Sequence, residues 1–404
     1  MAKALVLVEG QPVEYLTQRE SIQSVVVIGG GMGNQAISVR KVAVIAGAIC
    51  SYWIGSGFAS GQEVLQFFSV YGLKGIVGSV IFLVVMGSTT YVLCGAGQRM
   101  KFANPYQVFD LYCGKVLGEA YTWYTVVLIY CVFVVMLSGA GATINQYFHV
   151  PTYVGTVVIA ILAFGTAILG IERLIRIIGV IGPTMIVFIA IVGVAAIANV
   201  LRHSNVLADA GSRMSSLGFK SASANWAWSA VLYTFGALIC GIPFLVDCGA
   251  SARSVKEARI AGITGSVAFT TAIVLLIISE LVFSPLIAGQ QVPTLAMANH
   301  LSPLLGLLFT VLIVVCIYSS VSSFLLMTVR KFAQNRTRKS YFLTAVFAAF
   351  GAICGGILPF DKLINVIYPL AGYSAMLFVL LVIVRMLRER IARHASDSGG
   401  RTGI

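Results

Sequence analysis

Long apolar runs recur along this chain, and they limit its fold more than any other feature. A membrane-spanning helix needs about 20 consecutive apolar residues, and the sequence contains ten such runs. Hydrophobic residues make up 58% of the 404 residues and charged residues only 10%, whereas soluble domains carry about 25% charged residues. In lipid, every backbone polar group must be paired within the protein, and helices of this length satisfy that requirement. The sequence therefore predicts an all-α polytopic membrane protein.

The basic residues lie between the predicted spans, so they also predict the orientation. If the N-terminus is cytoplasmic, all but five of the 27 lysines and arginines fall on the cytoplasmic side, as the positive-inside rule requires. We expect both termini in the cytoplasm. This spread along the chain argues against nucleic-acid binding, which needs basic residues gathered on one face. The predicted spans cover approximately residues 42–70, 75–98, 119–147, 151–170, 174–200, 225–249, 260–283, 303–330, 341–358 and 363–387.

The spans form one ten-helix domain, predicted at residues 42–390, between a flexible leader (1–41) and a short tail (391–404). The leader contains Gly31-x-Gly33-x-x-Ala36, but a dinucleotide site would need a whole βαβ unit, and the first span begins too soon for one. The eight cysteines show neither C-x-x-C nor metal-ligand spacing. We therefore expect no nucleotide, resident metal or other cofactor.

The first span is interrupted by glycines and polar residues. Residues 52–63 read YWIGSGFASGQE, with three glycines and Glu63 inside an otherwise apolar run. Small residues can simply let two helices approach closely, and that alternative stays open for the glycines alone. An acid inside a membrane span is costly and marks a functional site by default. We therefore expect an unwound segment that lines a binding cavity.

The sixth span carries similar helix-breaking residues. Gly236 and Pro243 lie inside it, and a proline within a helix removes one backbone hydrogen bond. Spans 1–5 and 6–10 are then two repeats, about 42–200 and 225–390, each beginning with a broken helix. Because five is an odd number of spans, the second repeat must be inverted in the membrane. Interrupted helices at corresponding positions point to a transport site, although span 6 alone also fits an ordinary proline kink.

The eighth span carries a face of hydroxyl groups. Ser319, Ser322 and Ser323 stand at i, i+3 and i+4, so they share one side of the helix. Hydroxyl and carbonyl oxygens suit a hard cation such as Na⁺, and an unwound helix nearby would expose carbonyls. The alternative is a patch of serines that packs two helices together.

Two acids lie within the predicted spans. Glu63 follows the interruption of span 1, and Glu280 lies in the outer part of span 7. Burial disfavours the charged form of a carboxyl group, so either could carry a proton, and either could instead be structural. Asp247, near the cytoplasmic end of span 6, is expected to pair with Arg253. The outer loop 284–302 has the Pro-Thr start of a short helix that could act as a lid.

Together, these features resemble the leucine-transporter fold of the amino acid–polyamine–cation transporter superfamily. Gly55-Ser56-Gly57 followed by Phe58 is similar to the Gly-Ser-Gly signature of the amino acid exchangers in that superfamily. Residues 57–68, GFASGQEVLQFF, more closely resemble the YkvI-like family of bacterial membrane proteins. The resemblance implies a 5+5 inverted repeat with discontinuous helices 1 and 6, in the bacterial inner membrane.

The resemblance also implies particular binding residues. Backbone N–H groups at the break would receive a substrate carboxylate, with aromatic side chains and free carbonyls of span 6 around the same pocket. The implied substrate residues are Gly55, Ser56, Gly57, Phe58, Tyr233, Phe235 and Gly236. The implied Na⁺ ligands are the carbonyls of Ser51 and Ile54 and the hydroxyls of Ser319, Ser322 and Ser323.

We therefore expect a secondary transporter of a small zwitterion, an amino acid or an analogue, working by alternating access in the lipid bilayer. Sodium is favoured as the coupling ion, because span 5 contains no lysine of the kind that some proton-coupled relatives carry. The alternatives are proton coupling or exchange through Glu63 or Glu280, and a channel or sensor that uses the same fold without coupled transport. The sequence shows no H-E-x-x-H or G-x-S-x-G motif, so we expect no enzyme activity. It does not indicate an oligomeric state.

Overall fold

The chain separates into two units, residues Met1–Ile37 and Ser38–Ile404. The computed structural model describes residues 6–8, 11–13, 37–167, 181–202, 209–334, 337–358, 360, 362–364, 366–377 and 379–380. In the first unit, strands β1 (Val6–Val8) and β2 (Gln11–Val13) pair antiparallel, with Val6 opposite Val13. The leader therefore includes a small hairpin. Its glycine-rich stretch and the predicted tail lie outside the described residues.

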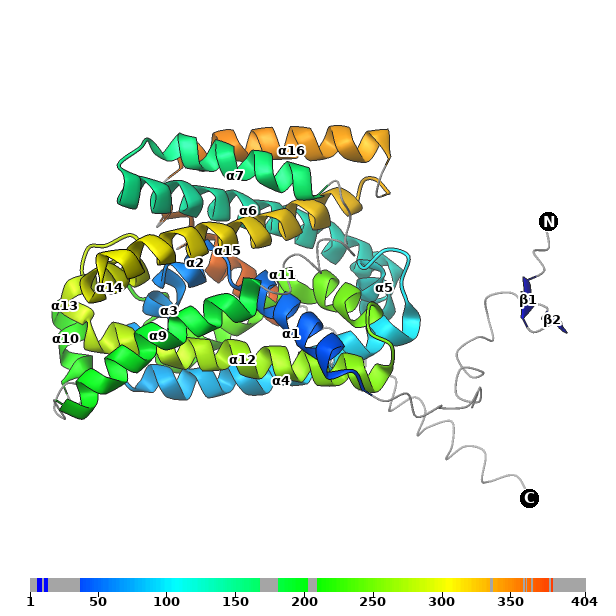
Figure 1. Ribbon diagram of the computed structural model, residues 1–404. Coiled ribbons are helices and arrows are strands. Elements are labelled where there is room, and N and C mark those ends of the chain that lie inside the picture. The colour runs from blue at the N-terminus through cyan, green and yellow to red at the C-terminus, as the bar shows by residue number, and fades with distance from the viewer. Residues whose placement is uncertain are drawn as a thin grey trace, which may run out of the picture. The chain divides into compact units, whose positions relative to one another are not determined.

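The second unit is helical throughout its described part (Figure 1). Its first half contains α1 (Val39–Trp53), α2 (Ser56–Ala59), α3 (Gln62–Phe67), the short 3₁₀ helix η2 (Ser69–Tyr71), α4 (Lys74–Met100), α5 (Gln107–Cys113), α6 (Lys115–Phe148), α7 (Thr152–Ala167) and α9 (Ile181–Arg202). Its second half contains α10 (Ala210–Ser216), α11 (Trp226–Ala250), α12 (Val255–Val282), α13 (Ser284–Ile287), α14 (Pro293–Leu301), α15 (Pro303–Arg330) and α16 (Arg338–Ile357). The described residues between 360 and 380 are helical as well.

Each of the ten predicted spans contains helix. Within the described residues, six helices are long and apolar enough to cross a membrane: α4, α6, α11, α12, α15 and α16. Shorter apolar helices cover Thr152–Ala167 and Thr184–Ala198, at spans 4 and 5. Span 1 is divided into α1, α2 and α3. The beginning of predicted span 5 lies outside the described residues.

Several helices begin at the polar residues that local chemistry favours. Ser38 accepts a hydrogen bond from the Lys41 amide at the start of α1. Asn225 Oδ1 accepts from the amides of Ala227 and Trp228 at the start of α11. Such caps satisfy amides that the first turn of a helix leaves unpaired, and they are typically worth about 1 kcal/mol. The expected short helix of the outer loop is present as α14, which begins at Pro293.

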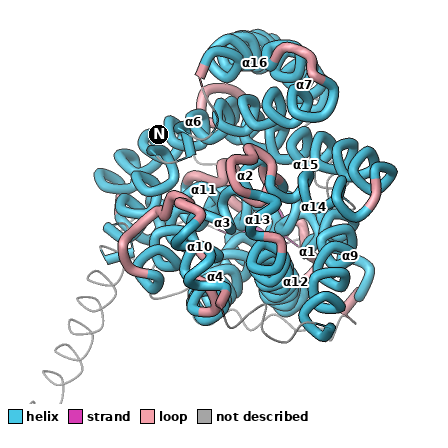
Figure 2. Tube along the Cα trace, turned by 90° about the vertical axis from the view of Figure 1, so that its left-hand side faces the viewer, coloured by secondary structure: helices cyan, strands magenta, loops and turns pink. Residues whose placement is uncertain are grey.

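Large apolar side chains divide between the inside of the bundle and its outer surface. Phe58, Phe82 and Phe269 are fully buried, and the ring of Phe269 contacts each of the other two. Val127 and Phe342 are exposed on outward faces, as lipid-facing residues are. The helix α4 packs along α11 and α12, whereas α7 and α16 pack together near α6 and α15. Figure 2 shows α2, α3 and α11 in the middle of this arrangement.

The predicted break in span 6 is wrong. α11 runs as one helix from Trp226 to Ala250, with Pro243 inside it. Its glycines serve close packing instead: a Cβ on Gly236 would lie 3.2 Å from the Tyr368 carbonyl oxygen, and one on Gly241 would lie 3.2 Å from Trp53 Nε1. Proline weakens a helix locally, but packing on both sides holds this helix together.

Candidate functional site

The interruption of span 1 is real and lies between buried helices. α1 ends at Trp53, four residues then form α2, and α3 begins after Gly61. Gly61 has a φ of +86°, in the left-handed region that favours glycine. The break therefore needs a glycine at this turn for conformational reasons. The side chain of Ser56 lies outside what the structure describes.

The outer loop is hydrogen-bonded to the interrupted segment of span 1. Thr294 Oγ1 donates to the Ala59 carbonyl at 2.7 Å, and the Thr294 amide donates to the Ser60 carbonyl at 3.0 Å. Gln62 Nε2 donates to the Gln290 carbonyl at 2.8 Å. The two Thr294 bonds supply partners for carbonyls at the interruption. The outer loop therefore contacts the break through α14.

On the side that faces α15, the end of α1 is hydrogen-bonded by Ser320, a residue that the sequence analysis did not predict. Ser320 Oγ lies 2.8 Å from both the Ser51 and the Ile54 carbonyl oxygens. The three predicted serines donate to carbonyls of their own helix: Ser319 to Cys316, Ser322 to Tyr318 and Ser323 to Ser319. Their i, i+3, i+4 spacing was correctly recognised, but the crossing of α1 over α15 selects the face that carries Ser320.

Glu63 is the acid at the centre of the break. It is only 3% exposed, and its Oε2 accepts a hydrogen bond from the Tyr233 hydroxyl at 2.9 Å. The side chain of Tyr368 lines the same cavity as this carboxyl group. A Cβ on Gly57 would collide with it, with Glu63 Cγ and Cδ at 2.6 and 2.7 Å. The Glu63 carboxyl group therefore fills the space that the missing side chain of Gly57 leaves open.

A small cavity lies against this acid. It has about 40 Å³ open to water-sized molecules, and since one water needs about 10–15 Å³ of such space, it has room for a few waters or a small head group. Its walls include five aromatic residues and Glu63, and its lining contains no lysine, arginine or histidine. The aromatic residues are Tyr52, Trp53, Tyr233, Phe324 and Tyr368. Trp53 Nε1 has no hydrogen-bond partner among the described residues.

The structure gathers only some of the predicted substrate residues around this cavity. Tyr233 and Gly236 line it. Phe58 is buried against Phe269, with ring centroids 4.5 Å apart, and neither Phe58 nor Phe235 is among the lining residues. Gly55 packs against Met136, whose Sδ would lie 3.3 Å from an added Cβ.

The sequence analysis also missed four of the aromatic residues that line the cavity: Tyr52, Trp53, Phe324 and Tyr368. Tyr52 and Trp53 directly precede the break, and this adjacency could have indicated them. Tyr368 comes from span 10, which no local motif connects with span 1. Its position at the cavity follows from packing alone.

A second buried acid lies beyond the cavity. Glu280 is fully buried, and its Oε2 accepts a hydrogen bond from Ser69 Oγ at 2.5 Å. Its Oε1 has no hydrogen-bond partner among the described residues, and it would lie 2.7 Å from a Cβ on Gly61. The two acids thus flank the break at different glycines.

At the other end of the bundle, Asp247 pairs with Arg330 and not with Arg253. Both side chains of this pair are largely buried. The Arg253 amide instead donates to Glu257 Oε1 at 3.0 Å. The expected pairing was therefore wrong, because an arginine on the neighbouring helix α15 reaches Asp247.

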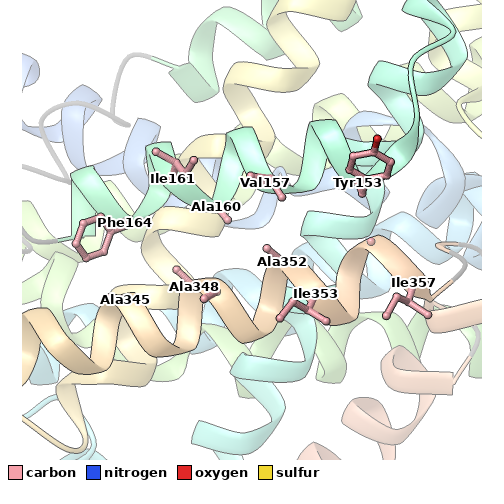
Figure 3. Close-up of a pocket in the computed structure, with 12 residues that line it drawn as sticks. Tyr153, Val157, Ala160, Ile161, Phe164, Ala345, Ala348, Ala352, Ile353 and Ile357 are labelled. Atoms are coloured by element: carbon pink, nitrogen blue, oxygen red, sulfur yellow. The ribbon is translucent and has the colours of Figure 1, made fainter.

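A larger hollow lies away from this chemistry. It is a groove of about 670 Å³ between α7 and α16. Figure 3 shows Val157, Ile161 and Phe164 of α7 across from Ala348 and Ile353 of α16. Its lining contains no charged side chain, and apolar surface of this kind is normal where helices face lipid. The cavity beside Glu63 is therefore the candidate site, despite its smaller volume.

Comparison with known proteins agrees with the fold. No family model matches the chain. Two proteins of Bacillus subtilis (strain 168) are similar in sequence: the uncharacterized membrane protein YkvI, 23% identical over 332 residues, and the uncharacterized protein YyaD, 23% identical over 133 residues. The YkvI match covers 81% of this chain and 90% of YkvI, whereas the YyaD match covers 33% of this chain and only 38% of YyaD.

Among solved structures, a Na⁺-coupled sialic acid symporter superposes with a TM-score of 0.61 at 12% identity, covering 78% of this chain and 73% of the symporter. MhsT in complex with L-phenylalanine gives 0.58 at 16% identity, covering 84% and 88%. A mutant of the manganese transporter of Eremococcus coleocola gives 0.55 at 14% identity, covering 88% and 80%. The chain is thus a polytopic membrane protein with the leucine-transporter-like fold.

Proposed function

We propose that this protein is a secondary transporter that moves a small solute across the membrane by alternating access. The observation that carries the proposal is the broken first helix, whose acid and neighbouring aromatic residues line a buried cavity. Broken helices with a site at the repeat interface are the usual construction of such transporters. The expected location is the bacterial inner membrane, with both termini in the cytoplasm.

Sodium coupling is the second part of the proposal. The Ser51 and Ile54 carbonyls and the Ser320 hydroxyl bring three oxygens together at the end of α1. A bound Na⁺ would take the hydroxyl oxygen and both carbonyls as ligands, while the hydroxyl proton turns away. The ion would thereby stabilise the contact between α1 and α15, which links ion binding to the geometry of the break.

Uptake into proteoliposomes tests this function. A panel of radiolabelled amines and amino acids is supplied with an inward Na⁺ gradient, and we expect at least one solute to accumulate. Ser320→Ala should weaken the apparent Na⁺ affinity by about tenfold or more, because it removes one oxygen ligand. Ser79→Ala is the matched control, since Ser79 is buried but donates to the Ile76 carbonyl of its own helix.

Other outcomes would contradict parts of this proposal. Flux that equilibrates without ever concentrating a solute would indicate a channel. Full Na⁺ dependence in Ser320→Ala would exclude the coupling site. Accumulation driven by a pH gradient without Na⁺ would favour proton coupling instead. The unpartnered, fully buried Oε1 of Glu280 supports that second candidate.

The amino acid expected from the sequence fits this cavity only in part. Its ammonium group would suit Glu63 and the aromatic walls. Its carboxylate would meet the Glu63 carboxyl group beside Gly57. Two carboxylates 4 Å apart repel each other by about 4 kcal/mol at an effective dielectric constant of 20. An amino acid would therefore bind only if Glu63 were protonated or displaced.

A further inference from the structure

Glu63 lies beside Gly57, where the sequence analysis expected the first helix to receive the carboxylate of a solute. Its carboxyl group lies directly against Gly57. The protein thus supplies a carboxylate of its own at the break. A solute that enters the neighbouring cavity meets this group as part of the wall.

The surroundings of Glu63 favour a positive partner. The Tyr233 hydroxyl donates to the carboxyl group at 2.9 Å, and Tyr368 lines the same cavity. Of the residues that line the cavity, one is an acid and none is basic. A buried carboxylate is costly unless it is paired. A cation in the cavity would neutralise the charge of Glu63, which no basic side chain in the cavity lining does.

The remaining walls suit an organic cation. The rings of Tyr52 and Phe324 lie 4.6 Å apart, and both line the cavity together with Trp53. Aromatic faces attract ammonium groups, most strongly where water is excluded. A divalent ion such as Mg²⁺ would instead need about six oxygen ligands. Among the described residues, no group of three or more His, Cys, Asp or Glu side chains is placed to hold a metal ion.

We propose that the solute is a small organic amine without a carboxylate, held by its protonated nitrogen between Glu63 and the aromatic walls. This inference rests on the proposed transport function, because it names the solute class for the same cavity. It replaces the zwitterion that the sequence predicted. Glu63 takes the place of the carboxylate that an amino acid would bring, so the site selects against amino acids.

Matched ligand pairs test this selectivity directly. Each pair consists of an amine and the amino acid that differs from it only by the carboxylate: ethylamine and alanine, isobutylamine and valine, phenethylamine and phenylalanine. The full-length purified protein is titrated with each compound, and the thermal unfolding midpoint is measured. We expect a saturable stabilisation by at least one amine, with binding about tenfold or more tighter than that of its amino acid. Equal or tighter binding of the amino acids would overturn the inference.

A charge-neutral variant tests the role of Glu63. Glu63→Gln keeps the shape and the hydrogen-bonding capacity of the side chain, and it should weaken amine binding by at least about 30-fold, as expected for one partner of a buried charge pair. Glu119→Gln is the control, because Glu119 is an exposed acid that bonds Lys331 at 2.7 Å. Unchanged amine affinity in Glu63→Gln would overturn the proposal. If that variant does not fold, the amine-to-amino-acid ratio of the natural protein decides alone.

Two further outcomes separate this inference from the transport function. Amine binding through Glu63 without accumulation of any solute in proteoliposomes would sustain the solute class and contradict transport. Concentrative uptake of amino acids alone would sustain transport and contradict the solute class. Stabilisation by Mn²⁺ but by none of the amines would also contradict it.

Discussion

Span 1 and span 6 carry similar helix-breaking residues, yet only span 1 breaks. Span 1 is divided into α1, α2 and α3, with Gly61 in the left-handed region. Span 6 contains Gly236, Gly241 and Pro243 and remains the single helix α11. Glycine and proline each weaken a helix, by about 1 and 3 kcal/mol relative to alanine. These local costs do not explain the difference between the two spans.

The difference lies in what receives the freed backbone groups. At span 1, Ser320 and Thr294 from two other helices donate to carbonyls of the interrupted segment. At span 6, Tyr52 donates to the Cys240 carbonyl at 2.6 Å, and the second donor is the Cys94 thiol, a weak donor 3.4 Å from the Leu245 carbonyl. A membrane helix opens where partners for its backbone are supplied from several sides. Glycine allows an interruption, and neighbouring polar side chains stabilise it.

The largest effect on solute uptake is expected for Gly57→Ala, which disturbs span 1 and leaves span 6 unchanged. Gly57→Ala places a methyl group where Glu63 Cγ and Cδ lie at 2.6 and 2.7 Å. Glu63 must then leave its partner Tyr233, and a lost bond to a charged group costs about 1.5–3 kcal/mol. Solute uptake at sub-saturating concentration should fall by more than about tenfold.

Two glycines serve as references for this prediction. Gly236→Ala in span 6 meets its nearest atom only at 3.2 Å and should have a smaller effect. Gly87→Ala, with no atom within 4 Å, should leave uptake unchanged. Equal losses of uptake in Gly57→Ala and Gly236→Ala would contradict the expected difference between span 1 and span 6.

An intermediate effect is expected at Gly61, where the backbone itself requires glycine. Gly61→Ala combines a φ of +86° with a contact of 2.7 Å to Glu280 Oε1. The left-handed conformation costs about 1–2 kcal/mol for a residue with a Cβ, and the contact adds to that cost. Thermal unfolding in detergent should therefore occur at a clearly lower temperature.

Gly289→Ala isolates the conformational part of this effect. Gly289 has a similar φ of +74°, but no atom lies within 4 Å of its added Cβ. It should destabilise the protein less than Gly61→Ala does. The same loss in both variants would mean that Glu280 does not restrict the break.

The smallest effect is expected for Pro243→Ala, which tests whether the continuity of span 6 matters for transport. Pro243→Ala adds a backbone N–H to a helix that is already continuous. Because proline is unfavourable in a helix interior, the free energy of unfolding should rise and not fall, with uptake preserved. Loss of uptake in a stabilised variant would indicate that α11 opens at this position during transport.

Much of the fold could be read from the chain before its packing was known. Hydropathy is a local property, so the ten apolar runs predicted the all-α membrane class and the approximate helix bounds. The polar residues at 52–63 predicted the break in span 1 for the same reason, because an intramembrane acid stands out in any context. Span 6 was predicted incorrectly, because breaker residues report a local tendency and not the partners that decide it.

The sequence alone determined the membrane class, the approximate helix bounds and the interruption of the first span. Only the tertiary structure decided the chemistry at that interruption. Ser320 was missed because helix crossing, and not spacing, selects which serine reaches α1. Tyr368 reaches the cavity beside Glu63 from a span more than 300 residues away in the chain. Glu63 lies against Gly57 because the chain turns back within a few residues. The rotation and crossing of helices decide which atoms share a cavity. The periodicity of a sequence does not contain that information.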